Sequence, residues 1–445
     1  MRMSWKKALV IAVVVLIVVA IAGWAVVRNS GKATLALEDQ MGVSPEILAP
    51  DPPIVTTLNF ATVVGWKDGE TPTPAAGLKV NAFAVDLDHP RWIVPLANGD
   101  VLVSETTGPR RPPAKSLRGI VRGFVMRRAG AAGDNANRVV LLRDADGDGV
   151  AESRTVLLSG LDSPVGMAVA NGQLYVAETS KLTRFPFTVG QTTITAPGVK
   201  VVDLPSRPLN HHWVKNVIAS PDGAKLYVTI GSNSNIGENG MAVEEGRAAI
   251  WEVDAATGQH RIFATGLRNP NGMAWNPVTG ELWTVVNERD GLGSDIVPDY
   301  LASVGLGDSF GWPCFYWGGY VDKRVADCDV QQAQYIRRPE YALGTHTAAL
   351  GLNFATGQML GARFAEGAFI GQHGSWNRKP KAGYQVIFVP FVNGKPTGKP
   401  LPVLTGFLNT KGEARGRPVE VAIDRTGSLL VADDAGNRIW RVSAQ

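Results

Sequence analysis

One two-strand unit recurs six times along this chain, and it constrains the fold more than any other sequence feature. Each copy has an apolar strand, a turn centred on Gly or Asp, and a second apolar strand, and copies follow one another at roughly 50 to 80 residues. The six strand pairs are 92–94 with 101–103, 166–169 with 173–176, 216–219 with 225–229, 272–275 with 281–285, 351–354 with 367–370, and 419–423 with 428–432. Repeated β-units of this size are typical of propeller blades. We therefore predict an all-β, six-bladed β-propeller over residues 57–445.

Composition agrees with a chain of many turns. The sequence has 445 residues, with 50 Gly, 28 Pro and only 19% charged residues. The alternatives are a β-sandwich, for which nearly 400 residues is too large for one core, and a β-helix, for which no short period is present. A net charge of +4 is small for this length, and without a concentrated basic face it does not indicate nucleic acid as a partner.

The N-terminus carries an apolar run at residues 8–27 that follows Arg2, Lys6 and Lys7. A run of this length is sufficient for one transmembrane helix, and the positive residues before it predict a cytoplasmic N-terminus and an exported body. We predict that residues 1–30 are a retained membrane anchor. The alternative is a cleaved signal peptide with a small-residue site at 20–22. Residues 31–56 lack sustained periodicity and are predicted to be a linker.

The chain has two cysteines, Cys314 and Cys328. In an oxidising compartment, a pair that closes a short loop favours a disulfide over a metal site, and the spacing is not Cys-x-x-Cys. A disulfide between them is therefore predicted, with two buried thiols as the alternative.

Polar and cationic residues stand just outside the repeated strands. They occur at 210–216, 268–269, 287–291, 311–313, 373–379 and 415–418. Because equivalent positions of different blades face one another around a propeller channel, these residues predict a positively charged mouth that contains an ionisable histidine. Such a site suits a small polyanionic ligand.

Four motifs give the chain a family resemblance. They are Gly-Leu-Arg-Asn-Pro-Asn-Gly at 266–272, Phe-Gly-Trp-Pro at 310–313, Arg-Gly-Arg-Pro-Val at 415–419, and the ending Ala-Asp-Asp-Ala-Gly-Asn-Arg-Ile-Trp-Arg at 432–441. In this order and spacing the chain, from about residue 80 to residue 442, resembles the pyrroloquinoline quinone (PQQ) dependent sugar dehydrogenases of the soluble glucose and aldose dehydrogenase type. It is more similar still to the membrane-bound L-sorbosone dehydrogenases.

The resemblance implies roles for individual residues. The catalytic base of the family falls on His212, with the adjacent His211 left open as the alternative. Cofactor contacts fall on Arg268, Asn269, Arg415 and Arg417, and Arg378 or Lys379 would replace a lysine of the family. These assignments suit the chemistry, because arginine pairs with the carboxylates of PQQ through two parallel hydrogen bonds and neutral histidine accepts a proton near pH 7.

Two stretches of the sequence are candidates for Ca2+ binding. The resemblance implies an active-site Ca2+ held by backbone carbonyls of Asp290 and Gly291, although the Glu-x-Gly-Pro loop of the family reads Glu-Arg-Asp-Gly here, at 288–291. A second Ca2+ site is suggested by Asp144, Asp146 and Asp148, with Glu152 in place of the usual Glu at position twelve of a calcium loop. An acidic hairpin turn without metal is the alternative there.

The remaining histidines carry weaker signals. His89, His260 and His346 are isolated and predicted to be structural or on the surface, and His373 is a candidate for substrate contact.

The expected activity is PQQ-dependent oxidation of an L-sorbosone-like sugar aldehyde or an aldose to the acid. The resemblance implies a bacterial inner-membrane protein with its catalytic domain in the periplasm, which passes electrons to ubiquinone or a separate cytochrome. Alternatives are a metal-dependent sugar lactonase, which would need acidic ligands around the channel, and a non-catalytic propeller that binds a carbohydrate or a protein. The chain contains no Cys-x-x-Cys-His haem motif.

Overall fold

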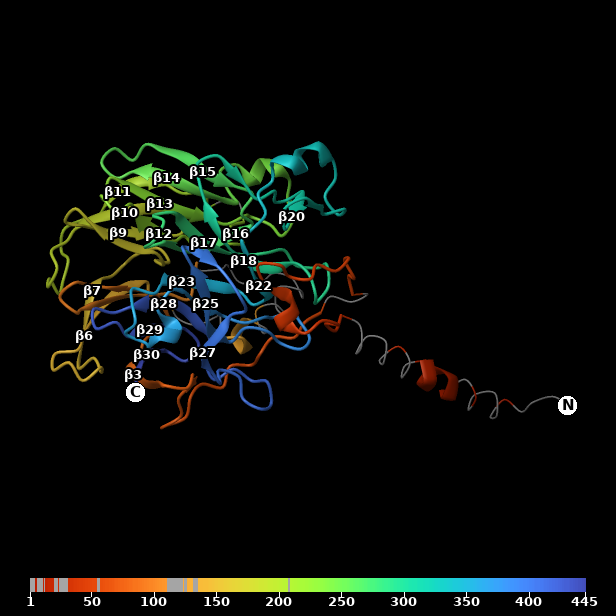
Figure 1. Ribbon diagram of the computed structural model, residues 1–445, viewed down its shortest axis with the longest axis horizontal. Helices are drawn as coiled ribbons and strands as arrows, with labels where there is room; N and C mark the ends of the chain where they lie inside the picture. Colours follow the sequence, from red (N-terminus) through yellow and green to blue (C-terminus); the bar gives the residue numbers. More distant parts are fainter. Residues whose placement is uncertain are drawn as a thin grey trace.

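The computed structural model describes residues 5, 11, 13–19, 23, 31–53, 57–109, 123, 126–130, 135–206 and 209–445. Within these residues, six antiparallel sheets stand around a central axis as the blades of a propeller (Figure 1). The predicted all-β, six-bladed propeller is therefore confirmed. The six predicted strand pairs are the two inner strands of the six blades.

Each blade has four main strands, which run from the central channel to the outside. The innermost strands are β4 (Pro90–Pro95), β8 (Met167–Ala170), β12 (Val217–Ala219), β16 (Asn269–Trp275), β23 (Ala349–Phe354) and β28 (Pro418–Ile423). The second strands are β5 (Val101–Glu105), β9 (Gln173–Ala177), β13 (Lys225–Ile230), β17 (Leu282–Asn287), β24 (Gly367–Gln372) and β29 (Leu429–Asp433). The third strands are β6 (Arg138–Arg143), β10 (Lys181–Pro186), β14 (Ala249–Asp254), β18 (Pro298–Val304), β25 (Gln385–Val392) and β30 (Arg438–Ala444). The outer strands are β7 (Ser153–Leu158), β11 (Val199–Asp203), β15 (His260–Thr265), β22 (Tyr341–Thr345), β27 (Leu401–Thr405) and β3 (Leu78–Ala84).

The ring of blades is closed in two ways, by contacts between the innermost strands and by pairing of the two ends of the domain. The innermost strands contact one another in chain order, and β28 of the sixth blade returns to contact β4 of the first. The outer strand of the sixth blade is β3, which comes from the beginning of the domain. In this strand Leu78 pairs with Ala444, which lies at the end of the domain. Pairing of the two ends of the domain in one sheet removes a free edge that an open ring would expose.

The core lies between the blades, because strand side chains alternate between two faces. In β17, Leu282 and Val286 join an apolar cluster with the third blade. Trp283 and Val285 point the other way and join a cluster with the fifth blade. Each pair of neighbouring blades shares one such cluster among the described residues. The period-two apolar pattern of each repeat therefore holds two blade interfaces at once.

Short elements extend the blades. They are β1 (Met41–Gly42) beside β22, β2 (Thr73–Pro74) beside β27, β19 (Asp308–Ser309) beside β15, β26 (Lys395–Pro396) beside β25, the hairpin β20 (Phe315–Tyr316) and β21 (Tyr320–Val321), and the 3-10 helices η1 (Leu37–Gln40), η2 (Met241–Glu244), η3 (Val330–Tyr335) and η4 (Ala362–Phe364).

The segment expected as a linker is packed on the propeller instead. Residues 31–53 contain η1 and β1, and Met41 pairs with Leu343 of β22. The Asp295 carboxylate accepts hydrogen bonds from Thr34 and Gln40. These bonds hold Thr34 and Gln40 on the propeller, so residues 31–53 of the segment predicted as a linker at 31–56 are packed against the blades.

The predicted membrane anchor at 1–30 lies largely outside the described residues. In the described part of the chain, no helix combines the length and the hydropathy needed to cross a bilayer.

Candidate active site

One end of the propeller collects the polar residues predicted from the sequence. At this end, which we call the mouth, every innermost strand begins and every second strand ends. His212, Arg268 and Arg417 precede innermost strands, whereas Asp290 and His373 follow second strands. The strand directions therefore bring residues far apart in the sequence to the same end of the channel.

His212 has a defined ring orientation. Its Nδ1 lies 2.7 Å from the carbonyl oxygen of Ser232 and 3.0 Å from the Ser232 hydroxyl. Because a carbonyl oxygen only accepts, Nδ1 carries the hydrogen and Nε2 is left with a lone pair. Burial, and then the charge of Arg268, lower the pKa of His212 to about 3. The ring is therefore neutral at pH 7, whereas the neighbouring His211 is exposed, and this geometry favours His212 as a base.

Glycine at position 231 brings two site residues together. A Cβ atom there would lie 2.4 Å from Oδ1 of Asn269 and 2.5 Å from Cβ of His212. Only a residue without a side chain leaves room for this approach. Asn269 Oδ1 is buried and has no hydrogen-bond partner among the described residues.

Arg268 is buried beside Asp290. Its guanidinium donates to the Glu288 carbonyl at 2.7 Å and to Asn235 Oδ1 at 2.9 Å, and it lies 3.2 Å from the Asp290 carboxylate. The same amide oxygen of Asn235 accepts from the backbone N–H of Asp290. Arg268 thus fixes the loop that carries Asp290 and leaves a positive charge next to His212.

Donors surround the Asp290 carboxylate. Asn377 Nδ2 lies 2.8 Å and His346 Nδ1 3.4 Å from its Oδ1. Burial raises the pKa of Asp290, but His346 and Arg268 together outweigh burial and hold the pKa below its usual range. His346, expected to be structural or on the surface, is therefore part of the site, and its Nε2 donates to the Gly293 carbonyl at 2.9 Å.

A second charged cluster has the Asp434 carboxylate at its centre. It accepts from Arg91 at 2.5 Å and from His373 Nε2 at 3.0 Å, and His89 Nε2 lies 3.4 Å away. These groups come from the sixth, first and fifth blades. Burial raises the pKa of Asp434, but His373, His89 and Arg91 outweigh burial and lower it.

His373 is a second histidine with an assigned tautomer. Because the Asp434 carboxylate accepts from Nε2, Nδ1 of His373 carries the lone pair. Burial, and then Arg417, lower the pKa of His373 to about 4 despite the carboxylate. Two neutral histidines, one on the third blade and one on the fifth, therefore belong to the mouth.

Arg91 and Asp434 were not predicted from the sequence. Arg91 occupies a β-bulge, since the register of β4 against β5 shifts between Pro90 and Trp92, and such bulges redirect a side chain. Nε of Arg91 is buried, and no described residue offers it a hydrogen-bond partner. Asp434 follows the second strand of its blade, as Asp290 does. This equivalent position in the repeat was the sequence signal that could have identified Asp434.

The other predicted cofactor residues have internal partners. Arg417 donates to the carbonyls of His373 and Gly374 and joins the second cluster. Arg415 lies 3.4 Å from the Glu70 carboxylate, with its guanidinium over the Trp66 ring.

Arg378 is buried and donates to the Ser294 and Pro380 carbonyls. The backbone carbonyl of Lys379 accepts from Ala33. Arg378, Lys379 and Arg415 therefore brace the mouth loops, and their contact with a cofactor stays a prediction.

Cys314 and Cys328 form the predicted disulfide, with an S–S distance of 2.08 Å. It closes a loop at the rim of the mouth. Buried Arg289 holds this loop, donating to the carbonyl oxygens of Pro313 and Phe315.

The acidic turn between β6 and β7 lies at the opposite end. One ligand atom from each of Asp144, Asp146, Asp148 and Glu152 falls within 4.8 Å of the others. The carboxylates also accept backbone N–H bonds within the turn, for example Asp144 from Gly147 at 2.7 Å. Both the calcium loop and the metal-free turn remain consistent with this geometry.

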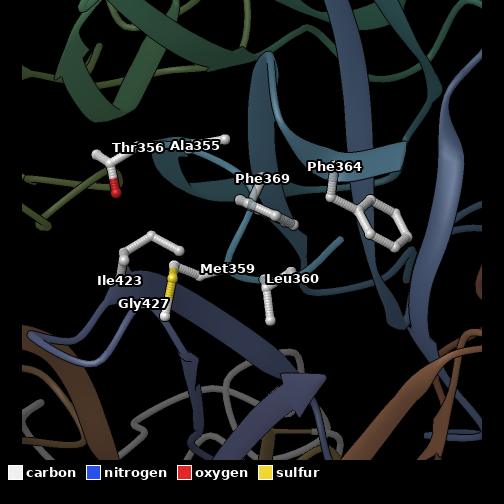
Figure 2. Close-up of a pocket in the computed structure, with 9 residues that line it drawn as sticks. Ala355, Thr356, Met359, Leu360, Phe364, Phe369, Ile423 and Gly427 are labelled. Carbon is white, nitrogen blue, oxygen red and sulfur yellow. The ribbon is translucent and has the colours of Figure 1, made fainter. Parts of the chain in front are cut away.

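A small pocket lies at this far end too, where β23 ends and β24 begins (Figure 2). Leu360, Phe364, Phe369 and Ile423 line it, and its lining contains no charged side chain. The polar chemistry of the chain is therefore at the mouth.

Comparison with known proteins agrees with the propeller fold described above. A Borreliella burgdorferi protein described as uncharacterized is 29% identical over 241 residues, which are 54% of this chain and 62% of that protein. The match thus spans less than two thirds of that relative. The iodide structure of a Trichoderma reesei enzyme of carbohydrate-active enzyme family AA12 has 20% identity and a TM-score of 0.68, covering 84% of this chain and 98% of the other.

The holo PQQ domain of a Coprinopsis cinerea pyranose dehydrogenase has 18% identity and the same TM-score of 0.68, covering 86% of this chain and all of that one. At these identities the two solved structures show the fold. A family described as TrAA12-like matches residues 133–299 and 315–445, well over half of the chain. This match supports the predicted kinship with PQQ-dependent sugar dehydrogenases, and the chain belongs to the TrAA12-like family.

Proposed function

We propose that this chain is a PQQ-dependent dehydrogenase that oxidises a sugar aldehyde or an aldose, with an L-sorbosone-like keto-aldehyde going to the corresponding acid. The observation that carries the proposal is the pairing, at one mouth, of two neutral histidines with buried guanidinium groups. A base and a set of fixed cations are what oxidation by an anionic quinone requires.

The residues of the mouth fit a polyanionic planar ligand. Arg91 Nε, Asn269 Oδ1 and Asn377 Oδ1 are buried polar atoms without partners in the described residues. Leaving such atoms unpaired costs about 1–3 kcal/mol each, so a polar ligand that supplies partners is favoured. Arg91 and Arg417 would hold its carboxylates, and Asn269 would accept from it beside His212.

The surroundings of Asp290 do not fit a calcium ion on its carboxylate. Its neighbours are Arg268, His346 and the amide N–H group of Asn377, all donors that suit an anion. The Asp290 carbonyl accepts from Asn235 at 3.0 Å and Arg324 at 2.8 Å. No catalytic step is therefore assigned to Ca2+.

In this proposal His212 is the base. Nε2 of the neutral ring takes the proton from a hydroxyl of the aldehyde hydrate or hemiacetal, and Ser232 holds the ring by accepting from Nδ1. A bound PQQ would supply the acceptor for the hydride that leaves the carbon bearing this hydroxyl. Arg268 disfavours the protonated state of His212, so the proton is readily passed on after the reaction.

Residues 8–27 are proposed to be a membrane anchor, with the catalytic domain on the periplasmic side of a bacterial inner membrane. The apolar run and the basic residues before it support this proposal. Ubiquinone or a separate cytochrome is then the electron acceptor.

Dye-linked oxidation tests the proposal. The full chain in detergent is assayed with L-sorbosone and with glucose, before and after addition of PQQ and Ca2+. Activity that requires PQQ and is lost in His212→Ala but kept in His211→Ala is expected. Failure of PQQ to bind or to restore activity would contradict the proposal, and lactone hydrolysis would be assayed next.

A further inference from the structure

The segment that follows the apolar N-terminal run enters the domain at the mouth. The Ser294 hydroxyl donates to the carbonyl of Gly31 at 2.5 Å, and Ala33 donates to the carbonyl of Lys379 at 2.7 Å. Ser294 lies on the loop that carries Asp290, and Lys379 lies on the loop that carries Asn377. Both loops shape the candidate active site.

From Gly31 the chain forms a strap, which we define as residues 31–53 and 57–66. Its first part lies beside β22 (Figure 1). Its second part follows the mouth loops, where Asn59 donates to the carbonyls of Trp376 and Arg378, both at 2.7 Å, and Val64 donates to the Ala414 carbonyl. The strap therefore follows the rim of the mouth from the fourth blade to the sixth.

This part of the rim exposes large apolar side chains. Leu58 is 59% exposed, Val64 is 51% exposed and Trp376 is 44% exposed. The Asn59 N–H donates to the Trp376 carbonyl, so the backbone of Leu58 lies close to that of Trp376. Scattered exposed apolar residues are ordinary, but a group of them on one rim marks an interaction surface.

Cations accompany the apolar side chains. Lys379 and Lys381 lie on the loop that contains Trp376, and Lys381 Nζ donates to Asn59 Oδ1 at 3.1 Å. A tryptophan, aliphatic side chains and lysines together are the composition found at the interface of a bilayer with anionic headgroups.

The length of the connection limits where the membrane can lie. Only residues 28–30 separate the apolar run from Gly31, so the chain reaches at most about 14 Å between them. An anchored chain must therefore keep the Gly31 side of the mouth within that reach of the bilayer surface.

We infer that the rim formed by Leu58, Val64, Trp376, Lys379 and Lys381 lies against the surface of a lipid bilayer. The inference rests on the proposed anchor and is independent of the proposed chemistry. It turns one edge of the candidate active site toward the membrane, an orientation that favours an electron acceptor confined to the bilayer over one in solution.

Site-specific labelling of the full chain in vesicles tests this orientation. The described residues contain no free cysteine, and the sequence has only the two that form the disulfide, so one introduced cysteine takes a fluorescent label selectively. Leu58→Cys and Trp376→Cys report on the rim. Val278→Cys is the matched control, because Val278 is 61% exposed in the β16–β17 turn at the opposite end.

The labelled chains are reconstituted into phosphatidylcholine and phosphatidylglycerol vesicles, floated, and quenched with doxyl-labelled lipid. Several-fold stronger quenching at residues 58 and 376 than at residue 278 is expected. Flotation with equal or absent quenching at all three positions would overturn the orientation while retaining the anchor. Absence of the chain from the floated fraction would overturn both. Neither quenching nor flotation depends on PQQ, so a failure of the proposed dehydrogenase activity is distinguishable from a failure of this orientation.

Discussion

Asp434, directly after β29, holds His373, directly after β24, with 3.0 Å between the carboxylate and Nε2. The same carboxylate holds Arg91 of the neighbouring first blade. One buried anion of the sixth blade thereby positions a histidine of the fifth blade and an arginine of the first. The arrangement resembles the orienting role of a carboxylate in a catalytic triad, where it fixes the tautomer of a histidine.

Asp434→Asn is expected to weaken PQQ binding roughly tenfold and to lower kcat less than His212→Ala does, because the carboxylate positions Arg91 and His373 whereas His212 is the proposed base. The amide keeps the shape but neither fixes the tautomer of His373 nor neutralises Arg91. Steady-state kinetics and PQQ titration of the purified variant measure the two effects. Asp222→Asn, in an exposed turn, is the control. Unchanged kcat with unchanged PQQ affinity would show that the cluster is only structural.

Separate replacement of the two adjacent histidines by alanine distinguishes the base from its neighbour. His212→Ala is expected to reduce kcat by about 10²–10⁴-fold, because Nε2 of this ring accepts the substrate proton in our proposal. His211 is exposed, and His211→Ala is expected to change kcat little. The dye-linked assay checks both, and equal losses in the two variants would rule out this assignment.

The pH dependence of stability follows from the lowered pKa of His212. Its pKa is about 3 in the folded chain and 6.5 in the unfolded chain, so the unfolded chain binds more protons between these values. The contribution of the neutral ring is complete above about pH 6.5 and is lost as the pH falls toward 3.

The melting temperature of the wild type should therefore fall more steeply between pH 6.5 and pH 4 than that of His212→Gln. Differential scanning fluorimetry across this range measures the difference. Parallel curves for the two proteins would mean that His212 titrates normally in the fold.

Reduction of the Cys314–Cys328 disulfide should lower stability more than activity. The cysteines are 14 residues apart, and closing a loop of this size stabilises by about 3 kcal/mol in the chain-entropy view. Buried Arg289 still holds the loop through two carbonyls. Melting curves and kcat of Cys314→Ser/Cys328→Ser measure both, and a large loss of kcat at full occupancy by PQQ would place the loop in catalysis.

The strap should come loose when Asp295 is removed. This carboxylate accepts from Thr34, Leu35 and Gln40, so Asp295→Ala leaves several donors without a partner. Limited proteolysis followed by mass spectrometry should show faster cleavage within residues 31–53 in the variant. Asp222→Ala serves as the control, and identical cleavage patterns would contradict the anchoring role.

The sequence predicted the blades because each inner strand carries a period-two apolar pattern that serves two interfaces. Leu282 and Trp283 show why, since they are adjacent in the chain and belong to different blade contacts. The position of His212 and Arg268 at the mouth was also predictable, because both lie in loops that lead into innermost strands, whereas the role of His212 as base came from the family resemblance and stays a prediction. In contrast, η1 and β1 have no apolar period of their own and depend on partners in distant loops such as Asp295, so the strap was taken for a linker.

Arg91 was missed for a different reason. It lies inside a strand, where the β-bulge turns its side chain toward Asp434. The alternation of apolar and polar residues in the sequence does not show where a bulge occurs. Arg378 was predicted from the sequence as a mouth-loop cation, but its internal partners, the Ser294 and Pro380 carbonyls, were not. The direction in which a loop arginine points depends on carbonyls supplied by other blades.

Equilibrium binding of PQQ tests the central claim most directly, since the mouth is proposed to hold this ligand. The full chain is titrated with PQQ, using quenching of tryptophan fluorescence, alongside Arg417→Gln and the control Arg425→Gln at the far end of the sixth blade. We expect saturable one-to-one binding that weakens at least about tenfold in Arg417→Gln, a loss of about 1.4 kcal/mol, and stays unchanged in Arg425→Gln. Absence of saturable binding, or equal affinity in all three proteins, would contradict the assignment of the mouth as the quinone site.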